Sequence, residues 1–417
     1  MDDVLLRQLA HRYHTPLYVF DESVIRRQCR RVRAAIAWPH TTCRYACKAL
    51  TIGAILRIIR AEGFHADASS INEVRRALAA GFLPGEVLYT GEGSSELVYR
   101  ELLDRGVHIN CASLDHLHLL GTLAPGAACS VRFNPGEGHG ESGKTNTGGP
   151  ASKHGIYIDE VEEVQRVCAR YGLNLRGIHS HIGSGADLEH WLRIKELTLG
   201  IARRFPGITF VNLGGGLPVV YNPATDAPMP LEAWGTRLSE SMAAFSAELG
   251  RPIELQIEPG RYLVAEAGSL IAEVQAVKRT PEFQFVIVNS GLNHNIRPAL
   301  YGSYHPIRFL SADGRELTGA EEYVVAGYLC ESGDIFTVHE EAPAPRPFPR
   351  VQVRDLMVMG NTGAYSHSMM SEYNSMNLPA SVLVGEHGSI RLIERRGTFE
   401  DLIRREVEVY NDEQTHG

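Results

Sequence analysis

A single lysine ends a short apolar segment near the start of the chain, in Arg44-Tyr45-Ala46-Cys47-Lys48-Ala49-Leu50. Lysine is rarely buried without a specific role. Taken alone, Lys48 has two interpretations. Its aliphatic stem can cover apolar surface at the rim of the core, or its amine can be held in place for chemistry. Which interpretation of Lys48 holds depends on whether other residues of the chain could form a chemical site with it.

Three glycines, Gly214-Gly215-Gly216, follow another apolar segment and are compatible with an anion site. Glycine lets backbone N–H groups approach a phosphate closely. The same run also suits a tight turn, so on its own it is weak evidence. Ser184 and the pair Gly260-Arg261 also stand at the ends of apolar segments. Together with the glycines they favour a phosphate site.

Two side chains could supply acid–base or ring chemistry. Glu258 can act as a general base or pair with a ring nitrogen. His181, in the run from His179 to Gly185, can be a base, a phosphate partner or a stacking ring. A metal site on His179 and His181 is the rival interpretation. Because the sequence fixes no third ligand, we predict no metal.

Strand-like and helix-like segments alternate in the part of the chain that carries these residues. Apolar, β-branched segments are separated by helical stripes such as Ile52, Ile55, Leu56 and Ile59. This alternation predicts parallel strands, and eight repeats predict an α/β fold with a (β/α)8 barrel of the TIM type. The predicted strands are Thr42–Ala49, Phe64–Ser69, Glu86–Thr90, Val107–Ala112, Ala128–Asn134, Leu175–Ile182, Ile208–Leu213 and Ile253–Ile257.

Polar, titratable or glycine residues stand at the end of every predicted strand, where such a barrel carries its chemistry. They include Lys48, Asp67, Thr90, Asn110, Arg132, His181, Gly214 and Glu258. Because a purely structural barrel does not need them there, this pattern favours the active-site interpretation of Lys48.

After about residue 265, strand-like segments follow one another without long helices, which predicts a C-terminal all-β domain. The expected organisation is an N-terminal segment, 1–25, that contributes to the β domain, then the barrel, 26–265, then the β domain, 266–417. The proline-rich stretch 342–350 is expected to be an exposed loop.

Composition narrows the functional class. The chain has 417 residues and a net charge of −8, which gives no basic surface for nucleic acid. No apolar run approaches the roughly 20 residues of a membrane span, and the N-terminus has no secretory signal. Seven cysteines without metal-type spacing indicate free thiols and a cytoplasmic location.

Lysine, phosphate site, carboxylate and aromatic ring together match one cofactor, pyridoxal 5′-phosphate. It needs a Schiff-base lysine, a phosphate cradle, a carboxylate on its pyridine nitrogen and a side chain against its ring. The sequence therefore predicts a site for pyridoxal 5′-phosphate at the ends of the barrel strands.

Longer motifs strengthen this prediction. The chain resembles the fold-type III, alanine racemase-like decarboxylases that use this cofactor, and within them it is most similar to the bacterial diaminopimelate decarboxylases. The resemblance covers nearly the whole chain. It rests on the segments 45–49, 132–136, 144–149, 152–155, 181–185, 258–261, 297–304, 330–334 and 362–365.

The resemblance implies a role for each matching residue. Lys48 would carry the cofactor and Cys330 would donate a proton. The cofactor would contact His181, Ser184, Gly216, Glu258, Gly260, Arg261 and Tyr365. The substrate would contact Arg261, Arg297, Tyr301, Glu331 and Tyr365. The resemblance also implies a homodimer, in which the Cys330-Glu331 segment reaches into the barrel of the partner subunit.

Three segments depart from the family pattern. Asn289-Ser290-Gly291-Leu292-Asn293-His294 stands where the family usually has Asp-Ala-Gly-Phe/Met-Asn-Asp. Tyr328 replaces a proline before the Cys330-Glu331 pair, and Met376-Asn377 replaces Arg or Phe with Pro. Such changes alter substrate shape more readily than they abolish cofactor binding.

The expected activity is a carboxy-lyase that converts meso-diaminopimelate to L-lysine and CO2. The alternative is a paralogous decarboxylase of a related amino acid or carboxylated conjugate in a specialised pathway. Two other classes stay open. A protein that only carries pyridoxal phosphate would need no Cys330-Glu331 segment, and a racemase on this fold would have a tyrosine where this chain has Cys330.

Overall fold

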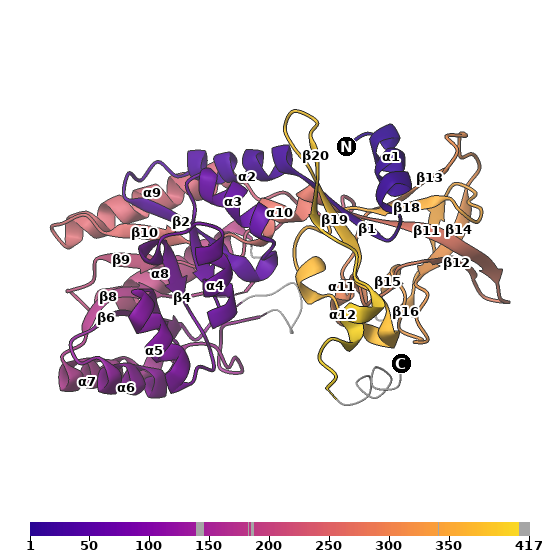
Figure 1. The fold of residues 1–417 in the computed structure, drawn as a ribbon. Helices are drawn as coiled ribbons and strands as arrows, with labels where there is room; N and C mark the ends of the chain where they lie inside the picture. Colours follow the sequence, from indigo (N-terminus) through magenta and orange to yellow (C-terminus); the bar gives the residue numbers. More distant parts are fainter. Residues whose placement is uncertain (139–145, 182, 185–186, 341, 408–417) are drawn as a thin grey trace. The chain divides into compact units, whose positions relative to one another are not determined.

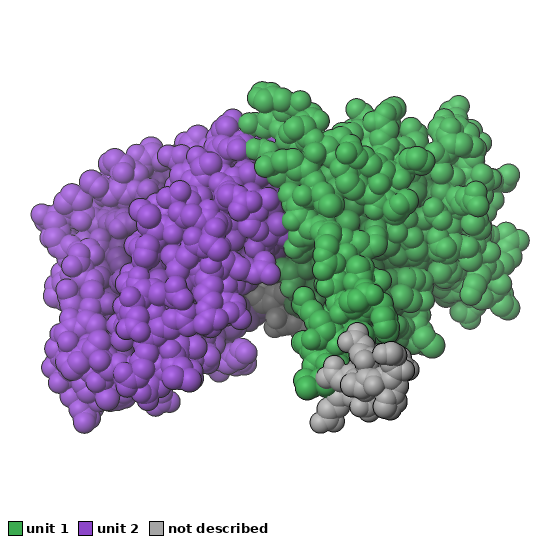
Figure 2. All heavy atoms as spheres, in the orientation of Figure 1, with its two compact units in different colours: residues 1–22, 266–417 green, residues 23–265 purple. Residues whose placement is uncertain are grey.

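The computed structural model describes residues 1–138, 146–181, 183–184, 187–340 and 342–407. It divides the chain into two units, drawn in different colours in Figure 2. One unit is Ser23–Ala265, and the other joins Met1–Glu22 to Glu266–Gly417. Within the described residues, no helix is long and apolar enough to cross a membrane.

Unit Ser23–Ala265 is a closed parallel barrel. Its strands pair in the order β5-β4-β3-β2-β10-β9-β8-β6, and β6 pairs back to β5. The barrel strands are β2 (Thr41–Ala46), β3 (His65–Ala68), β4 (Val87–Tyr89), β5 (His108–Cys111), β6 (Ala128–Asn134), β8 (Asn174–His179), β9 (Phe210–Asn212) and β10 (Glu254–Ile257). The eight-stranded barrel is thus confirmed, and a short strand β7 (Ile156–Tyr157) adds to β6.

Amphipathic helices cover the barrel, and Figure 1 shows them around the strands. In α3, the residues Ile55, Leu56 and Ile59 are fully buried, as the helical stripe predicts. Their removal from water stabilises the layer of helices on strands. The helices are α2 (Glu22–Ala35), α3 (Gly53–Ala61), α4 (Ile71–Ala79), α5 (Glu96–Arg105), α6 (Leu114–Leu123), α7 (Val161–Tyr171), α8 (Leu188–Ala202), α9 (Leu231–Glu248) and α10 (Arg261–Val264).

The second unit is built on a mostly antiparallel sheet with the order β17-β14-β12-β11-β1-β19-β20. Strand β18 pairs with β11 and β13. The strands are β1 (Leu17–Asp21), β11 (Gly268–Arg279), β12 (Gln284–Val288), β13 (Ile307–Leu310), β14 (Glu321–Ala326), β17 (Arg346–Phe348), β18 (Leu356–Met359), β19 (Ala380–Val384) and β20 (Ile390–Glu394). A two-stranded sheet of β15 (Val338–His339) and β16 (Ala342–Pro343) and the helices α1 (Asp3–Tyr13), α11 (Arg297–Tyr301) and α12 (Phe399–Ile403) complete it.

The N-terminal segment belongs to this second unit because β1 lies inside its sheet, antiparallel to β11 and parallel to β19. Helix α1 adds Leu6 and Leu9 to a core that includes Ile271 and Val382. All four side chains are at most 1% exposed. The C-terminal β domain expected from the sequence is confirmed as a unit that is mostly sheet and also carries the helices α1, α11 and α12.

Two details of the prediction are wrong. The stretch 342–350 is not simply an exposed loop, because β17 pairs with β14 and buries Phe348. Its prolines are tolerated because β17 stands at the edge of the sheet. The first barrel strand ends at Ala46, and Lys48 lies in a short 3-10 turn, Cys47–Ala49, instead of in the strand.

Candidate active site

Lys48 leaves the core at the end of β2. Cys47, Ala49 and Leu50 on either side of it are fully buried, whereas Lys48 is exposed. Ala46, the residue before the turn Cys47–Ala49, donates its N–H to the carbonyl oxygen of Pro259 at 3.4 Å, which connects this turn to the end of β10. The charge of Lys48 acts on the pKa values of Asp67, Glu73 and His181. The amine therefore shares its surroundings with other strand-end side chains.

Glu258, directly after β10, is a buried carboxylate held in the ionised form. Asn212 donates from Nδ2 to its Oε1 at 2.5 Å, and His179 Nε2 lies 3.4 Å from its Oε2. Burial alone would raise the pKa of Glu258, but His179 and the hydrogen bond from Asn212 outweigh it and lower the pKa. A negative charge is thus fixed at the carboxyl ends of the barrel strands, which we call the mouth of the barrel.

A chain of buried polar groups supports this carboxylate from behind. Asn110 Nδ2 lies 2.7 Å from His179 Nδ1 and 3.0 Å from Thr90 Oγ1. Ser130 Oγ donates to Asn110 Oδ1 at 2.8 Å. Because Asn110 Nδ2 donates to Nδ1, the Nε2 of His179 carries a proton and faces Glu258. The sequence assigned no role to Asn110, Thr90 or Ser130, although Asn110 and Thr90 stand at the ends of predicted strands.

Asp67, at the end of β3, is the second buried carboxyl group of this mouth. Burial and the charge of Glu258 raise the pKa of Asp67 well above its ordinary value. Two carboxyl groups that share a dry site do not both ionise easily. Asp67 therefore keeps its proton to a higher pH than Glu258 does. Its Oδ1 is buried and has no hydrogen-bond partner among the residues that the structure describes, which leaves a polar atom available to a bound molecule.

His181 is oriented by the glycine loop that follows β9. Gly215 donates its N–H to His181 Nδ1 at 3.0 Å. Burial, together with the positive charges of Lys48 and Arg132, lowers the pKa of His181 well below its ordinary value. The ring is consequently neutral at physiological pH, with Nδ1 as the acceptor. A neutral, fixed imidazole suits packing against a flat ring better than it suits binding a phosphate.

The glycine loop has the shape of an anion cradle. Gly214 and Gly216 have φ angles of 66° and 97°, which strongly favour glycine. A Cβ on Gly216 would fall 2.5 Å from the carbonyl oxygen of Gly183, and one on Gly214 would fall 2.6 Å from His181 Nδ1. Only a backbone without side chains fits there, as an approach to a phosphate requires.

A buried guanidinium stands on the same side of the mouth. Arg261 donates to Tyr221 OH at 3.2 Å and to Ser184 Oγ at 3.4 Å. Gly260 packs closely on the lysine turn, since a Cβ there would lie 3.0 Å from that of Ala46. The cradle, the guanidinium, the ionised carboxylate and the exposed lysine fit the polar groups of pyridoxal 5′-phosphate.

Other candidate residues lie in the second unit. Arg297, at the start of α11, is 1% exposed, and its Nη1 lies 3.1 Å from His305 Nε2. His305 Nδ1 lies 3.0 Å from the carbonyl oxygen of Gly360, so Nδ1 carries the proton and Nε2 accepts from Arg297. His305 thus orients the guanidinium, a role the sequence did not reveal. Tyr301 ends the same helix, and half-buried Tyr365 has a φ of 58°.

Cys330 and Glu331 are exposed on one turn of this unit. The N–H of Cys330 donates to Asn374 Oδ1 at 2.8 Å, and Tyr373 OH donates to Glu331 Oε2 at 3.4 Å. A pocket of about 550 Å³ opens beside them. It is lined by Leu292, Ala299, Glu331, Gly333, Ser371 and Tyr373.

The predicted site residues therefore fall into two groups. Lys48, His181, Ser184, Gly216, Glu258, Gly260 and Arg261 belong to the barrel, and Arg297, Tyr301, Cys330, Glu331 and Tyr365 belong to the β unit. Residues 144–145, 182 and 185 of the predicted motifs lie outside the described residues. Among the residues that the structure describes, no group of three His, Cys, Asp or Glu side chains could hold a metal.

The barrel and its mouth define an enzyme that works with a phosphorylated, ring-shaped cofactor. A family model, "Pyridoxal-dependent decarboxylase, pyridoxal binding domain", matches residues 22–265. The chain therefore belongs to the pyridoxal-dependent decarboxylases, and its cofactor is pyridoxal 5′-phosphate.

Full-length relatives agree with this membership. The chain is 42% identical to a diaminopimelate decarboxylase of Streptomyces coelicolor, over 98% of this chain and 93% of the relative. It is 39% identical to one of Escherichia coli K12, over 96% of each. Among solved structures, a diaminopimelate decarboxylase matches with a TM-score of 0.92 and 38% identity, over 97% and 96% of the two chains. The Helicobacter pylori enzyme complexed with L-lysine matches with a TM-score of 0.86 and 28% identity, over 96% and 98%.

Proposed function

We propose that the chain decarboxylates meso-diaminopimelate to L-lysine and CO2. The observation that carries the proposal is its identity of 42% to a diaminopimelate decarboxylase over nearly the full length of both chains. The alternative, a paralogue for another amino acid or a carboxylated conjugate, is not favoured by the relatives. The lysine/ornithine decarboxylase of Vibrio vulnificus, at 20% identity, shares the fold.

When bound, pyridoxal 5′-phosphate supplies a ring that accepts the electron pair released as the carboxylate leaves. Lys48 holds the cofactor through its Nζ, which is the exposed amine of the mouth. Glu258, kept ionised by Asn212 and His179, would keep a proton on the ring nitrogen of the bound cofactor. His181 would pack against the face of that ring. The phosphate is held by Ser184, Gly216, Gly260 and Arg261, and Tyr365 adds a further contact.

The β unit contributes most of the substrate contacts. Arg297 and Tyr301, together with Arg261, bind substrate carboxylate, and Tyr365 also touches the substrate. Glu331 is the only carboxylate among the residues that line the pocket of about 550 Å³, and most of its neighbours there are uncharged and small or apolar. A carboxylate at the edge of such a pocket suits an ammonium group on an aliphatic chain, which is the distal end of diaminopimelate.

Cys330 delivers the proton that replaces CO2. Its thiol is exposed, so Sγ can reach a bound molecule and exchange its proton with water afterwards. We further propose a homodimer in which the turn with Cys330 and Glu331 enters the barrel mouth of a second copy. Cytoplasmic function is supported by the seven cysteines, all of which are free thiols.

The test is CO2 release from a panel of substrates: meso-diaminopimelate, lysine, ornithine, arginine and carboxylated conjugates. We expect release from meso-diaminopimelate with L-lysine as the product. Release only from another member of the panel would support the paralogue, and racemisation without CO2 would contradict a decarboxylase. Sedimentation velocity measures the dimer, and mixing inactive Lys48→Ala with inactive Cys330→Ala chains should restore part of the activity if sites are shared.

A further inference from the structure

Three loops of the β unit meet at the turn that carries Cys330 and Glu331, which we call the tip. Loop 289–295 follows β12, loop 327–334 contains the tip itself, and loop 371–377 precedes β19. Each of the three contains one of the departures from the family pattern. Segments that are far apart in the sequence thus come together at the tip, and hydrogen bonds between them hold them there.

Asp334 ties the first loop to the second. Its buried carboxylate accepts the N–H of Leu292 at 2.6 Å and the N–H of Leu329 at 2.8 Å. Gly291 and Gly327 leave room for this carboxylate, because a Cβ on either glycine would collide with it. The residue next to the tip, Leu329, is therefore fixed to loop 289–295 through a single side chain.

Asn374 ties the third loop to the tip directly. Its Oδ1 accepts the N–H of Cys330 at 2.8 Å, and the neighbouring Tyr373 donates its hydroxyl to Glu331 at 3.4 Å. Asn374 and Ser375 have φ angles of 57° and 55°. Two successive left-handed residues other than glycine are unusual, and they are the geometry that aims the Asn374 side chain at the tip.

His294 contacts residues of all three loops. Its ring lies 6.2 Å from the ring of Tyr328, and its Nε2 lies 3.3 Å from the carbonyl oxygen of Asn377. Ser290 Oγ lies 3.1 Å from Nδ1. His294 is fully buried, and burial lowers its pKa to about 4, so the ring is neutral. Residues of all three departures thus contact one another through this imidazole.

The pocket beside Glu331 has its walls on the same loops. Leu292 comes from the first, Glu331 and Gly333 from the second, and Ser371 and Tyr373 from the third. Ala299, the remaining lining residue, belongs to α11, which also carries Arg297 and Tyr301. A shift of any one loop would move both the tip and the wall of the pocket.

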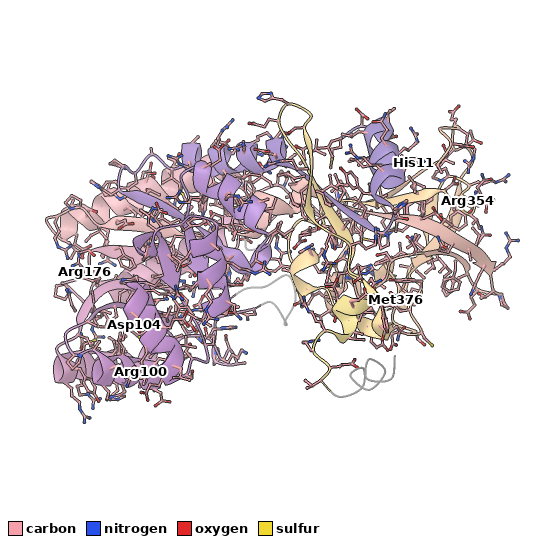
Figure 3. The ribbon with its side chains drawn as sticks, in the orientation of Figure 1. His11, Arg100, Asp104, Arg176, Arg354 and Met376 are labelled. Carbon is pink, nitrogen blue, oxygen red and sulfur yellow. The ribbon has the colours of Figure 1, made fainter. Side chains whose placement is uncertain are left out.

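We propose that the three loops act as one positioning unit for Cys330 and Glu331, in which Asn374 holds the tip. His294, Tyr328 and Asn377 depend on one another, so that the effect of replacing one depends on which residues stand at the other two positions. This inference rests on the proposed function of the tip. His294, Tyr328, Asn374 and Asn377 act through the tip, so they are positioning residues and not catalytic ones. Met376, which completes the third departure, is labelled in Figure 3.

A matched pair of variants tests the role of Asn374. Asn374→Gly keeps the left-handed backbone but removes the acceptor for Cys330, whereas Ser375→Gly makes the same type of change one residue later. For the holoenzyme with meso-diaminopimelate, we expect Asn374→Gly to lower kcat/KM about tenfold and Ser375→Gly to change it less than about twofold. Equal effects of the two variants would contradict the proposal.

Alkylation of Cys330 by iodoacetamide gives a readout that needs no substrate. Cys330 is the exposed cysteine, Cys168 is half-buried, and the other five are buried. Peptide mass spectrometry can therefore follow Cys330 alone. We expect Asn374→Gly to change its alkylation rate at least about threefold at unchanged Tm, because the N–H and thiol of a released turn are no longer fixed. An unchanged rate would refute the positioning role.

Coupling among the departures is tested by returning to the family pattern. His294→Asp and Tyr328→Pro alone should each lower kcat/KM about tenfold. The combined variant His294→Asp, Tyr328→Pro, Met376→Arg, Asn377→Pro should recover to within about threefold of the starting protein. If kcat/KM of the combined variant instead falls by the product of the factors seen in the single variants, the coupling is contradicted. If a single variant does not fold while the combined variant does, the same coupling is measured in Tm; if neither folds, coupling is refuted.

Failure of the proposed function is distinguishable from failure of this inference. If the protein releases no CO2 from meso-diaminopimelate, the proposed function is wrong. The alkylation rates of Cys330 in the same variants still decide whether the loops position the tip, because that reaction requires neither substrate nor cofactor.

Discussion

Asn212 donates a hydrogen bond of 2.5 Å to Glu258, and both side chains are buried at the mouth of the barrel. Asn212 is the last residue of β9 and Glu258 directly follows β10, and the two strands are paired in parallel. The amide thus stabilises a charge that burial opposes. Removing it should move the pKa of Glu258 upward.

The first prediction concerns this bond. Asn212→Leu removes a donor to the ionised carboxylate, so the pKa of Glu258 rises toward that of an unsupported buried acid. We expect kcat to fall about tenfold to a hundredfold at neutral pH, and the acidic limb of the pH–rate profile to move to higher pH. Rates measured from pH 5 to 9 check both. An acidic limb at the same pH in the variant would argue against this role of Asn212.

Lys48 gives the second prediction. Lys48→Ala should abolish CO2 release, by at least about a thousandfold, and remove the visible absorbance of bound cofactor, because the mouth loses its exposed amine. Lys278→Ala is the control, since this lysine is exposed on β11. Absorbance and reduction with borohydride measure the attachment. Retention of both in Lys48→Ala would show that another amine carries the cofactor.

Gly216 gives the third. Gly216→Ala places a Cβ 2.5 Å from the carbonyl oxygen of Gly183 and forces alanine to a φ of 97°. We expect the dissociation constant of the cofactor to rise at least about tenfold, since strain of this kind costs about 1–3 kcal/mol. Gly200→Ala in α8 is the matched control, because a Cβ there would meet no atom of the described part of the chain within 4 Å. Fluorescence titration of the apoenzyme compares them, and equal affinities would refute the cradle.

Asp334 gives a prediction for stability and pH. Burial raises the pKa of Asp334 to about 6, above its ordinary value of 3.8. The folded state therefore binds this proton more tightly than the unfolded state, and the stability from this group is lost as pH rises from about 4 to about 6. Relative to Asp334→Asn, the wild type should lose about 1–3 kcal/mol of unfolding free energy between pH 4 and pH 7. Denaturant titrations at both pH values measure this, and a constant difference would contradict it.

His305 gives the last. Its Nε2 accepts from Arg297, so His305→Leu leaves the buried guanidinium without this partner. We expect KM for meso-diaminopimelate to rise at least about fivefold, with a smaller change in kcat, because Arg297 is proposed to bind substrate carboxylate. His339→Leu, on the exposed strand β15, is the control. A change confined to Tm would indicate that His305 serves folding alone.

Much of the site could be predicted because it follows from the repeat. Apolar segments alternating with helical stripes predict parallel strands, and closure brings all their carboxyl ends to one mouth. Lys48, Gly214 and Glu258 were therefore expected together from their positions alone. The same logic predicted the β domain, but not that the proline-rich stretch includes strand β17.

Partners that lie far apart in the sequence could not be predicted. Asn374 and Cys330 are separated by 44 residues, and Asn212 and Glu258 by 46. No periodic pattern encodes such a pair, because a single hydrogen bond depends on the direction of two side chains and not on which face of an element is apolar. The departures at His294, Tyr328 and Asn377 lie in three separate segments of the sequence, and only the fold places Tyr328 and Asn377 beside the imidazole of His294.

Residue type and spacing were sufficient to predict the barrel, its eight strand ends and the cofactor that their chemistry suits. The affinity of each acid for its proton depends instead on neighbours that the fold brings together. Asp67 and Glu258 are both acids at strand ends, yet the pKa of Glu258 is lowered and that of Asp67 is raised. Burial disfavours the ionised form of both carboxyl groups. Asn212 and His179 offset this effect at Glu258 but not at Asp67.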